Sequence, residues 1–387
     1  MRILIVLTYY RPHISGLTIY AERLAAAFVR QGHQVTVLTS QFKKSLPREE
    51  VIEGVRIVRV PVAFRLSKGV IMPTFGLTAS RLVKENDVVQ LHLPQFDAAG
   101  VALRGRMAKK PTVITFHCDL LMPPGLLSKA ANAAVNVMNK IAGLATHRIV
   151  TYTQDYADHS AYVSKFPKKT IIIPPPVVLP VVNQKAMDAF AKVHNPENRR
   201  PVIGMVARFA TEKGVEVLLN ALPRILEVHP NALVEFVGPY QKIIGEEKYF
   251  ARLKPQIDQY IESGNWQFVG SLNPTEIAAY YPNLDVHVLP SLNSTEAFGL
   301  VQIEAMMNGV PCVTSNLPGV RQPVAVHGMG KIFPIGDSNA CAEAVLEVLA
   351  NREKYHHGDP QSFARYTPDA IAAAYVKLFD QIQQEVK

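Results

Sequence analysis

The sequence has 387 residues, more than one typical hydrophobic core holds, and therefore predicts two domains. With 48% hydrophobic and 19% charged residues, the composition is that of a globular protein and excludes a disordered chain. No apolar run approaches the roughly 20 residues of a membrane span, and the first run is too short for a signal peptide. Three widely spaced cysteines give neither a disulfide framework nor a zinc pattern, so we expect a cytoplasmic protein.

Positive charge is concentrated in the first half of the chain. Residues 1–183 carry 23 Lys and Arg against 10 Asp and Glu, a net +13, whereas residues 184–387 carry 18 against 22, a net −4, within a total of +9. This asymmetry indicates an anionic partner for the first half. No recognition-helix, zinc-finger or RNA-binding aromatic motif is present, which argues against nucleic acid and favours an anionic membrane surface or acceptor. A basic fold with scattered solvated side chains is the alternative.

The first residues predict a Rossmann-like start. A strand over 2–7, a loop over 8–18 and a helix over 19–31 precede a second strand over 34–39. The loop lacks G-x-G-x-x-G, and only Gly16 lies near the start of the helix. Glycine would let the backbone approach a ligand closely there, although a plain turn glycine is the alternative.

The next segments predict shorter elements. Residues 51–60 alternate around a glycine and predict a hairpin or short strands, and residues 61–77 predict a loop with a short helix. Strands over 87–92 and 112–116 flank a helix over 96–107.

Two polar side chains follow the strand over 112–116. His117 and Asp119 lie at its carboxyl end, where open α/β sheets bind ligands. His117 is either a catalytic or sugar-contacting group or a plain loop histidine. Asp119 either binds an acceptor hydroxyl or caps the next helix. Further on, the triple proline at 174–176 begins an extended hinge, the expected domain boundary.

A second strand–loop–helix unit carries two cations. Arg208 and Lys213 follow a strand over 201–207 and precede a helix, so they can clamp a diphosphate without a metal. The chain then alternates strands, glycines and helices, as a second Rossmann-like domain requires: strands over 233–237 and 266–269 that end at Gly238 and Gly270, and helices over 246–260 and 273–281.

Residues 285–316 form the most informative stretch. A strand, a polar loop and a helix lead to another strand, and the amides of residues 298–301 at the helix N-terminus offer an anion site. Glu296 and Glu304 are little more than two helical turns apart, so both can face one crevice. Because carboxylates accept hydrogen bonds from vicinal hydroxyls, the stretch indicates a ligand with a central diphosphate and a sugar at each end. Two solvated glutamates are the alternative.

This stretch resembles a known family. The string E-AFGLVQI-E followed by A-M-x-x-G-x-P-x-V is similar to the E-x7-E signature of retaining glycosyltransferases of family 4, and G-x-V-A-R-x-x-x-E-K-G over 204–214 to the family's second marker. The resemblance implies an α/β, GT-B fold of two Rossmann-like domains facing across a cleft. An acceptor-binding domain over 1–180 would be completed by a terminal helix over 367–387, with a nucleotide-sugar-binding domain over 181–366.

The resemblance also implies roles for single residues. Those implied as catalytic are His117 near the reacting sugar, Arg208 and Lys213 on the donor phosphates, and Glu296 on hydroxyls of the transferred sugar. By the same resemblance, Glu304 would bind the ribose of the nucleotide. The other residues expected to contact the sugar donor are Gly16, Gly238, Gly270, Phe298, Gly299, Leu300 and Val301. We assign Tyr9, Tyr10 and Asp119 to the acceptor. The family's Gly-Gly-x-x-E turn is altered here, because Gln322 replaces the glutamate.

These features predict a retaining hexosyltransferase that forms an α-glycosidic bond from a UDP- or GDP-sugar. The sequence has no D-x-D motif, so we expect no cofactor and no metal. The family resemblance implies front-face attack in which the departing phosphate helps to take the acceptor proton. The basic first half favours an acceptor on a membrane lipid or lipid-linked glycan, and a cytoplasmic protein peripheral to the inner face of the membrane. Alternatives are a soluble acceptor, a sugar-nucleotide epimerase of the same fold, or a catalytically silent nucleotide-sugar-binding subunit.

Overall fold

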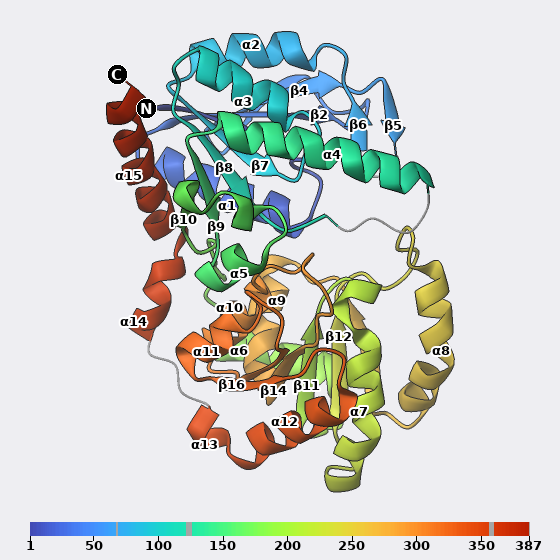
Figure 1. Cartoon of the computed structure of the whole chain (residues 1–387). Coiled ribbons are helices and arrows are strands. Elements are labelled where there is room, and N and C mark those ends of the chain that lie inside the picture. The colour runs from blue at the N-terminus through green and yellow to red at the C-terminus, as the bar shows by residue number, and fades with distance from the viewer. Residues whose placement is uncertain (67–68, 121–125, 356–359, 387) are drawn as a thin grey trace. The chain divides into compact units, whose positions relative to one another are not determined.

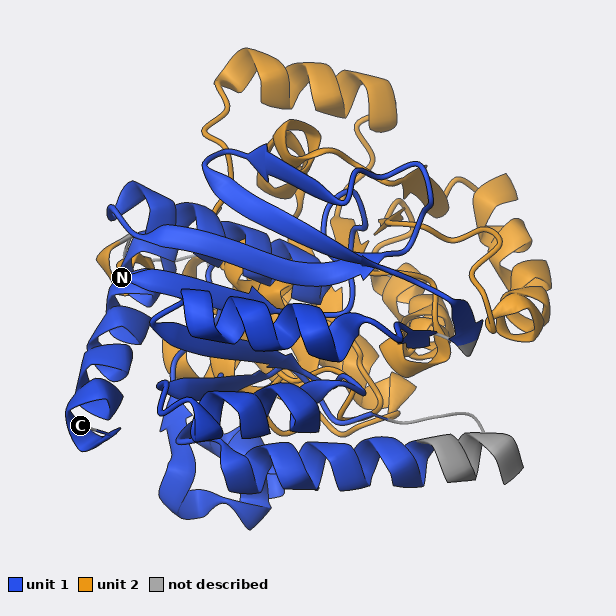
Figure 2. Ribbon diagram, turned by 90° about the horizontal axis from the view of Figure 1, so that it is seen from above, with its two compact units in different colours: residues 1–176, 365–387 blue, residues 177–364 orange. Residues whose placement is uncertain are grey.

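The computed structural model of the chain describes residues 1–66, 69–120, 126–355 and 360–386. The chain divides into two compact units, unit 1 with residues 1–176 and 365–387, and unit 2 with residues 177–364 (Figure 2). The sequence placed these divisions at 180 and 366. No helix among the described residues is long and apolar enough to span a bilayer.

Unit 1 is built on an eight-stranded sheet in the order β10-β9-β8-β7-β1-β2-β4-β3. All neighbours pair in parallel except β3 and β4, which form the antiparallel hairpin that the sequence predicted. Its strands are β1 (Arg2–Val6), β2 (Gln34–Gln41), β3 (Glu49–Ile52), β4 (Val55–Pro61), β7 (Val88–Leu93), β8 (Thr112–Phe116), β9 (Arg148–Thr151) and β10 (Thr170–Ile172). Every residue of β7 and β8 is buried, as expected of parallel strands covered on both faces.

Helices pack on unit 1 in two groups. The first pairs α1 (Gly16–Arg30) with α15 (Pro368–Val386), and the second places α3 (Ala98–Met107) against α2 (Phe75–Glu85) and α4 (Leu126–Ala145) (Figure 1). Right-handed crossovers from β1 to β2 and from β7 to β8 run in opposite directions, which puts α1 and α3 on opposite faces of the sheet. The unit also contains α5 (Gln154–His159), η1 (Val163–Lys165) and η2 (Pro167–Lys169).

The prediction for the segment 61–77 was wrong. In place of a loop with a short helix, a separate hairpin of β5 (Phe64–Leu66) and β6 (Gly69–Ile71) is followed by the three-turn helix α2, whose buried residues repeat at helical spacing. Residues 67 and 68 of this segment lie outside the described part. Strands of three residues are too short to show a period of two, which explains the missed hairpin. The helix expected from residue 96 begins at Ala98.

The terminal helix belongs to unit 1, as predicted. The hydroxyl of Tyr375 lies 2.9 Å from the hydroxyl of Tyr20 in α1 and 2.7 Å from Thr115 Oγ1 in β8. Arg30 donates to Asp369 over 2.8 Å at the other end of α15. The buried hydroxyl contacts connect the end of the chain to the middle of the sheet.

Unit 2 is built on a six-stranded parallel sheet in the order β13-β12-β11-β14-β15-β16. Its strands are β11 (Val202–Val206), β12 (Leu233–Val237), β13 (Trp266–Gly270), β14 (Val286–Leu289), β15 (Cys312–Ser315) and β16 (Gly330–Phe333). Its helices are α6 (Gln184–His194), η3 (Thr211–Lys213), α7 (Val215–Val228), α8 (Glu247–Glu262), α9 (Pro274–Tyr280), η4 (Tyr281–Asn283), α10 (Leu300–Met306), α11 (Gln322–His327), α12 (Ser338–Ala350), α13 (Arg352–Tyr355) and α14 (Pro360–Phe363), with η5 (Ala364–Tyr366) at the junction to unit 1.

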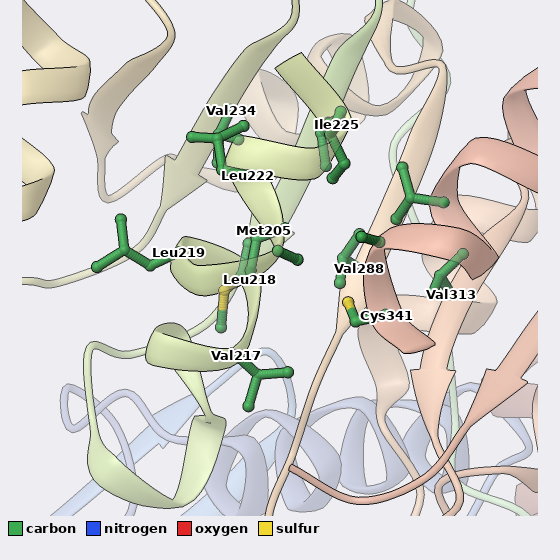
Figure 3. Close-up of a cluster of buried hydrophobic side chains, with 14 of the residues drawn as sticks. Met205, Val217, Leu218, Leu219, Leu222, Ile225, Val234, Val288, Val313 and Cys341 are labelled. Atoms are coloured by element: carbon green, nitrogen blue, oxygen red, sulfur yellow. The ribbon is translucent and has the colours of Figure 1, made fainter. Parts of the chain in front are cut away.

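The core of unit 2 lies between the sheet and the packed pair α7 and α12. Leu218 and Leu222 of α7 and Cys341 of α12 lie with side chains of the central strands, among them Met205 and Val288 (Figure 3). All five are fully buried. The two predicted Rossmann-like domains are therefore confirmed as two parallel α/β units.

Each sheet reverses its strand order once. In unit 1 the chain proceeds from β1 to β2 on one side and from β7 to β8 on the other, so the reversal lies between β1 and β7. In unit 2 it lies between β11 and β14 for the same reason. Ligands of open α/β sheets bind outside the carboxyl ends of the strands at such a switch point. The loops after these four strands are therefore where a site is expected.

Candidate functional site

The loops after β11 and β14 meet at the switch point of unit 2. The Leu292 amide donates to the Glu212 carbonyl over 2.9 Å. Gly214 has φ +66°, and a Cβ there would lie 2.1 Å from the Pro290 carbonyl oxygen. Only glycine combines this backbone conformation with so close an approach, so Gly214 allows the two loops to pack against each other.

Two ion pairs line this junction. Arg208 pairs with Glu212 within the first loop, and Lys213 pairs with Glu296 across the two loops. The side chains of Lys213 and Glu296 are only 20% and 18% exposed, so the pair is partly shielded from water. The sequence predicted Arg208, Lys213 and Glu296 as site residues, and the structure brings the last two into direct contact. It did not predict Glu212 as the partner of Arg208.

The same carboxylate also reaches the start of α10. The Gly299 amide donates to Glu296 Oε1 over 3.1 Å, and Gly299 adopts φ +77°. Leu300 and Val301 are the first residues of α10, where backbone amides have no acceptor within the helix. Phe298 is buried just before them. A lysine, a carboxylate and helix-end amides therefore lie together at the switch point.

Glu304 occupies a more enclosed position in α10. It is 9% exposed, and the buried Tyr281 of η4 donates its hydroxyl to Glu304 Oε2 over 3.0 Å. This contact fixes the orientation of the carboxylate. Sequence reasoning missed Tyr281 because the contact is tertiary and no motif links the two residues.

Two of the glycines predicted to contact the donor, Gly238 and Gly270, differ in what surrounds them. A Cβ on Gly238, at φ +131°, would lie 2.1 Å from the Ala207 carbonyl oxygen, so this glycine is needed where the ends of β11 and β12 approach. A Cβ on Gly270, at φ +87°, would have no neighbour within 4 Å, so the space beside this glycine is open. Within the described residues, no three His, Cys, Asp or Glu side chains are grouped to hold a metal ion.

The loop after β1 lies at the switch point of unit 1. Gly16, the first residue of α1, is exposed, and a Cβ there would have no neighbour within 4 Å. Tyr9 stacks on His13 with ring centroids 4.8 Å apart, and Phe42 packs edge-on against both rings. Tyr10 is 3% exposed and lies in the core, which makes Tyr9 the more accessible of the two tyrosines predicted to contact the acceptor.

His117 is held between two other polar side chains. Its Nε2 lies 2.8 Å from Nδ1 of His92, and its Nδ1 contacts the hydroxyl of Tyr152. Burial, with a smaller effect of His92, lowers the pKa of His117 well below its ordinary value, so the ring is neutral. Both ring nitrogens have protein partners in this arrangement. A direct contact of the ring with a substrate oxygen would require one of these partners to give way.

Asp119 is buried in unit 1, and its carboxylate is hydrogen-bonded to neighbouring residues. Its carboxylate accepts hydrogen bonds from Ser160 Oγ at 3.0 Å, the Tyr156 hydroxyl at 3.2 Å and the Ala161 amide at 3.3 Å. It is 7% exposed. These contacts attach the loop after β8 to the end of α5. Asp119 therefore has a structural role within unit 1.

Two family models match the chain, one on each unit. The Glycosyltransferase Family 4 model matches residues 14–179, and the Glycosyl transferases group 1 model matches residues 187–363. Together they span both switch points.

Relatives and solved structures of similar length agree with these matches. Phosphatidyl-myo-inositol mannosyltransferase of Mycobacterium leprae is 24% identical over 99% of this chain and 97% of its own. Glycogen synthase of Mycobacterium tuberculosis is 28% identical over 90% and 86%. Among structures, Anabaena HepE in complex with UDP and glucose has a TM-score of 0.75 at 18% identity, covering 98% of this chain and 99% of that one. Sucrose-phosphate synthase of Thermosynechococcus elongatus has a TM-score of 0.74 at 20% identity, covering 99% of each.

Proposed function

Since the chain belongs to the GT-B glycosyltransferases that join a family 4 domain to a group 1 domain, we propose that it moves a hexose from a UDP- or GDP-sugar to an acceptor hydroxyl with retention of configuration. The observation that carries this proposal is the Lys213–Glu296 ion pair at the switch point of unit 2, beside the first amides of α10. A nucleotide diphosphate sugar offers a complementary group to each of these features.

The ion pair suggests how the donor is received. A donor phosphate replaces Glu296 as the partner of Lys213, and the freed carboxylate accepts hydrogen bonds from hydroxyls of the sugar. Arg208 and the amides of Leu300 and Val301 add positive potential on the same side. Glu304, oriented by Tyr281, accepts the ribose hydroxyls.

The same groups support the chemical step. As the glycosidic bond breaks, negative charge develops on the leaving diphosphate, and fixed positive groups stabilise that charge most when they are already in place. Arg208 and Lys213 supply this fixed positive charge, so we propose a reaction that needs no metal ion. The departing phosphate takes the proton of the acceptor hydroxyl as that hydroxyl attacks on the same face.

The acceptor is proposed to be carried by a lipid. The mycobacterial relatives with nearly full coverage are named phosphatidyl-myo-inositol mannosyltransferases. The net charge of +13 in residues 1–183 fits association with an anionic membrane surface.

A donor assay in EDTA tests the proposed function. The protein is incubated with UDP- and GDP-hexoses, first with water as acceptor and then with a lipid extract, and released nucleotide and sugar are followed by NMR. We expect nucleotide release from donors of one base, with an α-anomer as the first product of an α-linked donor. No release from any donor would contradict glycosyl transfer, a β-anomer would contradict retention, and an isomerised donor of unchanged mass would identify an epimerase.

A further inference from the structure

The loop after β7 is the second loop at the switch point of unit 1. It comprises residues 94–97, between the end of β7 and the start of α3, and it flanks the reversal opposite the loop after β1. The His117 amide donates to the Leu93 carbonyl over 3.0 Å, which places the start of this loop beside the loop after β8. By topology it corresponds to the loop after β14 in unit 2, which carries Glu296.

Asp97 closes this loop without a partner of its own. It occupies the N-cap position of α3, yet its side chain makes no capping hydrogen bond, and it forms no ion pair within the described part of the chain. The side chain is half-buried, and burial raises the pKa of Asp97 to about 6. A shielded carboxylate with no compensating donor destabilises the fold, so folding alone does not account for it.

Gln95, two residues before Asp97, has a hydrogen-bond donor without an acceptor. It is 6% exposed, and its Nε2 has no hydrogen-bond partner. Buried side-chain amides in native proteins are normally paired. One loop at a ligand-binding position thus holds an unpaired acceptor and an unpaired donor, with Phe96 between them 46% exposed.

We propose that Gln95 and Asp97 bind the acceptor, Asp97 accepting and Gln95 donating hydrogen bonds to neighbouring hydroxyls of a polyhydroxylated ring, a sugar or a cyclitol. The proposal rests on the proposed function and assigns its acceptor a chemical class. Because residues 94–97 include a carboxylate and no cation, the loop suits neutral hydroxyls better than phosphate. A hydroxyl both donates and accepts hydrogen bonds, so hydroxyls satisfy the Asp97 carboxylate and the Gln95 amide nitrogen alike.

Binding of simple ring polyols tests the proposal without turnover. The probes are myo-inositol and methyl α-mannopyranoside, measured by saturation-transfer NMR with the full chain, with glycerol 3-phosphate as an anionic comparison. We expect the wild-type protein to bind a ring polyol and Asp97→Asn to bind it roughly 10- to 100-fold more weakly, the effect of losing a charged hydrogen bond. Asp158→Asn is the control, because Asp158 is exposed on α5 and, in the part of the chain that the structure describes, its carboxylate accepts one side-chain hydrogen bond, from Gln154.

A second variant separates binding from folding. Gln95→Leu removes a buried amide nitrogen that has no hydrogen-bond partner, so the thermal midpoint should stay unchanged or rise while polyol binding weakens on the order of fivefold to tenfold. Wild-type polyol affinity in Asp97→Asn, or no binding of any ring polyol by the wild-type protein, would overturn the proposal. Nucleotide release in the donor assay is measured separately, so failure of glycosyl transfer and failure of this acceptor site are distinguishable.

Discussion

At the scale of single residues, His287 shows what a buried polar group without partners does to stability. It lies in β14, fully buried, and neither ring nitrogen has a hydrogen-bond partner. Burial lowers the pKa of His287 to about 3. In the unfolded chain the same ring binds a proton below about pH 6.5. The folded state therefore becomes less stable relative to the unfolded state as the pH falls from about 6.5 toward 3.

We expect His287→Leu to reduce the acid sensitivity of the fold. Between pH 7.5 and pH 5, protonation of this one ring in the unfolded state should cost the wild-type protein about 2 kcal/mol that the variant does not lose. At pH 7.5 the variant should be equally or more stable, because an unpaired buried polar group is replaced by an apolar one. Urea unfolding at the two pH values measures both effects. An equal loss of stability in the two proteins would show that His287 is protonated in the folded state.

The identities of the candidate donor residues were predictable, and their contacts were not. Arg208, Lys213 and Glu296 follow from two sequence motifs, because each motif places charged groups next to the start of a helix. That Lys213 contacts Glu296 depends on β11 and β14 being neighbours, which one sequence does not specify. Gln95 was missed for a similar reason, since an unpaired amide is recognised only once its burial is known.

At the scale of elements, α15 is secured to unit 1 by a buried hydroxyl. Tyr375 is fully buried and its hydroxyl contacts Tyr20 of α1 and Thr115 of β8. These contacts join three segments that are far apart in the sequence. Such a hydroxyl contributes more than an average hydrogen bond because its removal leaves two buried partners incompletely satisfied.

We expect Tyr375→Phe to lower the free energy of unfolding by about 1–3 kcal/mol, the cost of leaving buried polar groups unpaired. Tyr260→Phe is the matched control, since Tyr260 of α8 is partly exposed and its hydroxyl has no hydrogen bond in the described structure. Denaturant unfolding of both variants gives the comparison. Equal stability of the two would mean that the contacts of Tyr375 do not hold α15 in place.

Long elements were predicted better than short ones. The strands over 112–116 and 233–237 and the terminal helix agree with the observed bounds, because each is a sustained apolar pattern. The hairpin of β5 and β6 and the short helix α5 were not foreseen. Each spans at most two helical turns or three strand residues, too few for a pattern to repeat.

At the scale of the whole molecule, one mostly parallel sheet and one parallel sheet each present a switch point, and the positive charge is unevenly divided along the chain. Length and the triple proline were enough to predict two domains. The strand order that creates the switch points was accessible only through the family resemblance, since many parallel α/β orders share the same succession of strands and helices.

The charge asymmetry leads to a prediction for membrane binding. We expect the protein to sediment with vesicles that contain anionic phosphatidylglycerol, and this binding to fall steeply as the ionic strength rises, because exposed charges are screened within about 8 Å at 0.15 M salt. Neutral phosphatidylcholine vesicles are the control. Equal binding to both vesicle types, or binding that salt does not weaken, would argue against an electrostatic membrane contact.

Binding of a nucleoside diphosphate at the junction of the loops after β11 and β14, where Lys213 pairs with Glu296, is tested by calorimetric titration with UDP and GDP in EDTA. The wild-type protein is compared with Lys213→Met and with Lys254→Met, whose lysine pairs with Asp258 on the exposed side of α8. We expect one nucleotide to bind the wild-type and Lys254→Met proteins alike, and Lys213→Met to bind roughly 10- to 100-fold more weakly. Wild-type affinity in Lys213→Met would show that Lys213 does not bind the nucleotide phosphates.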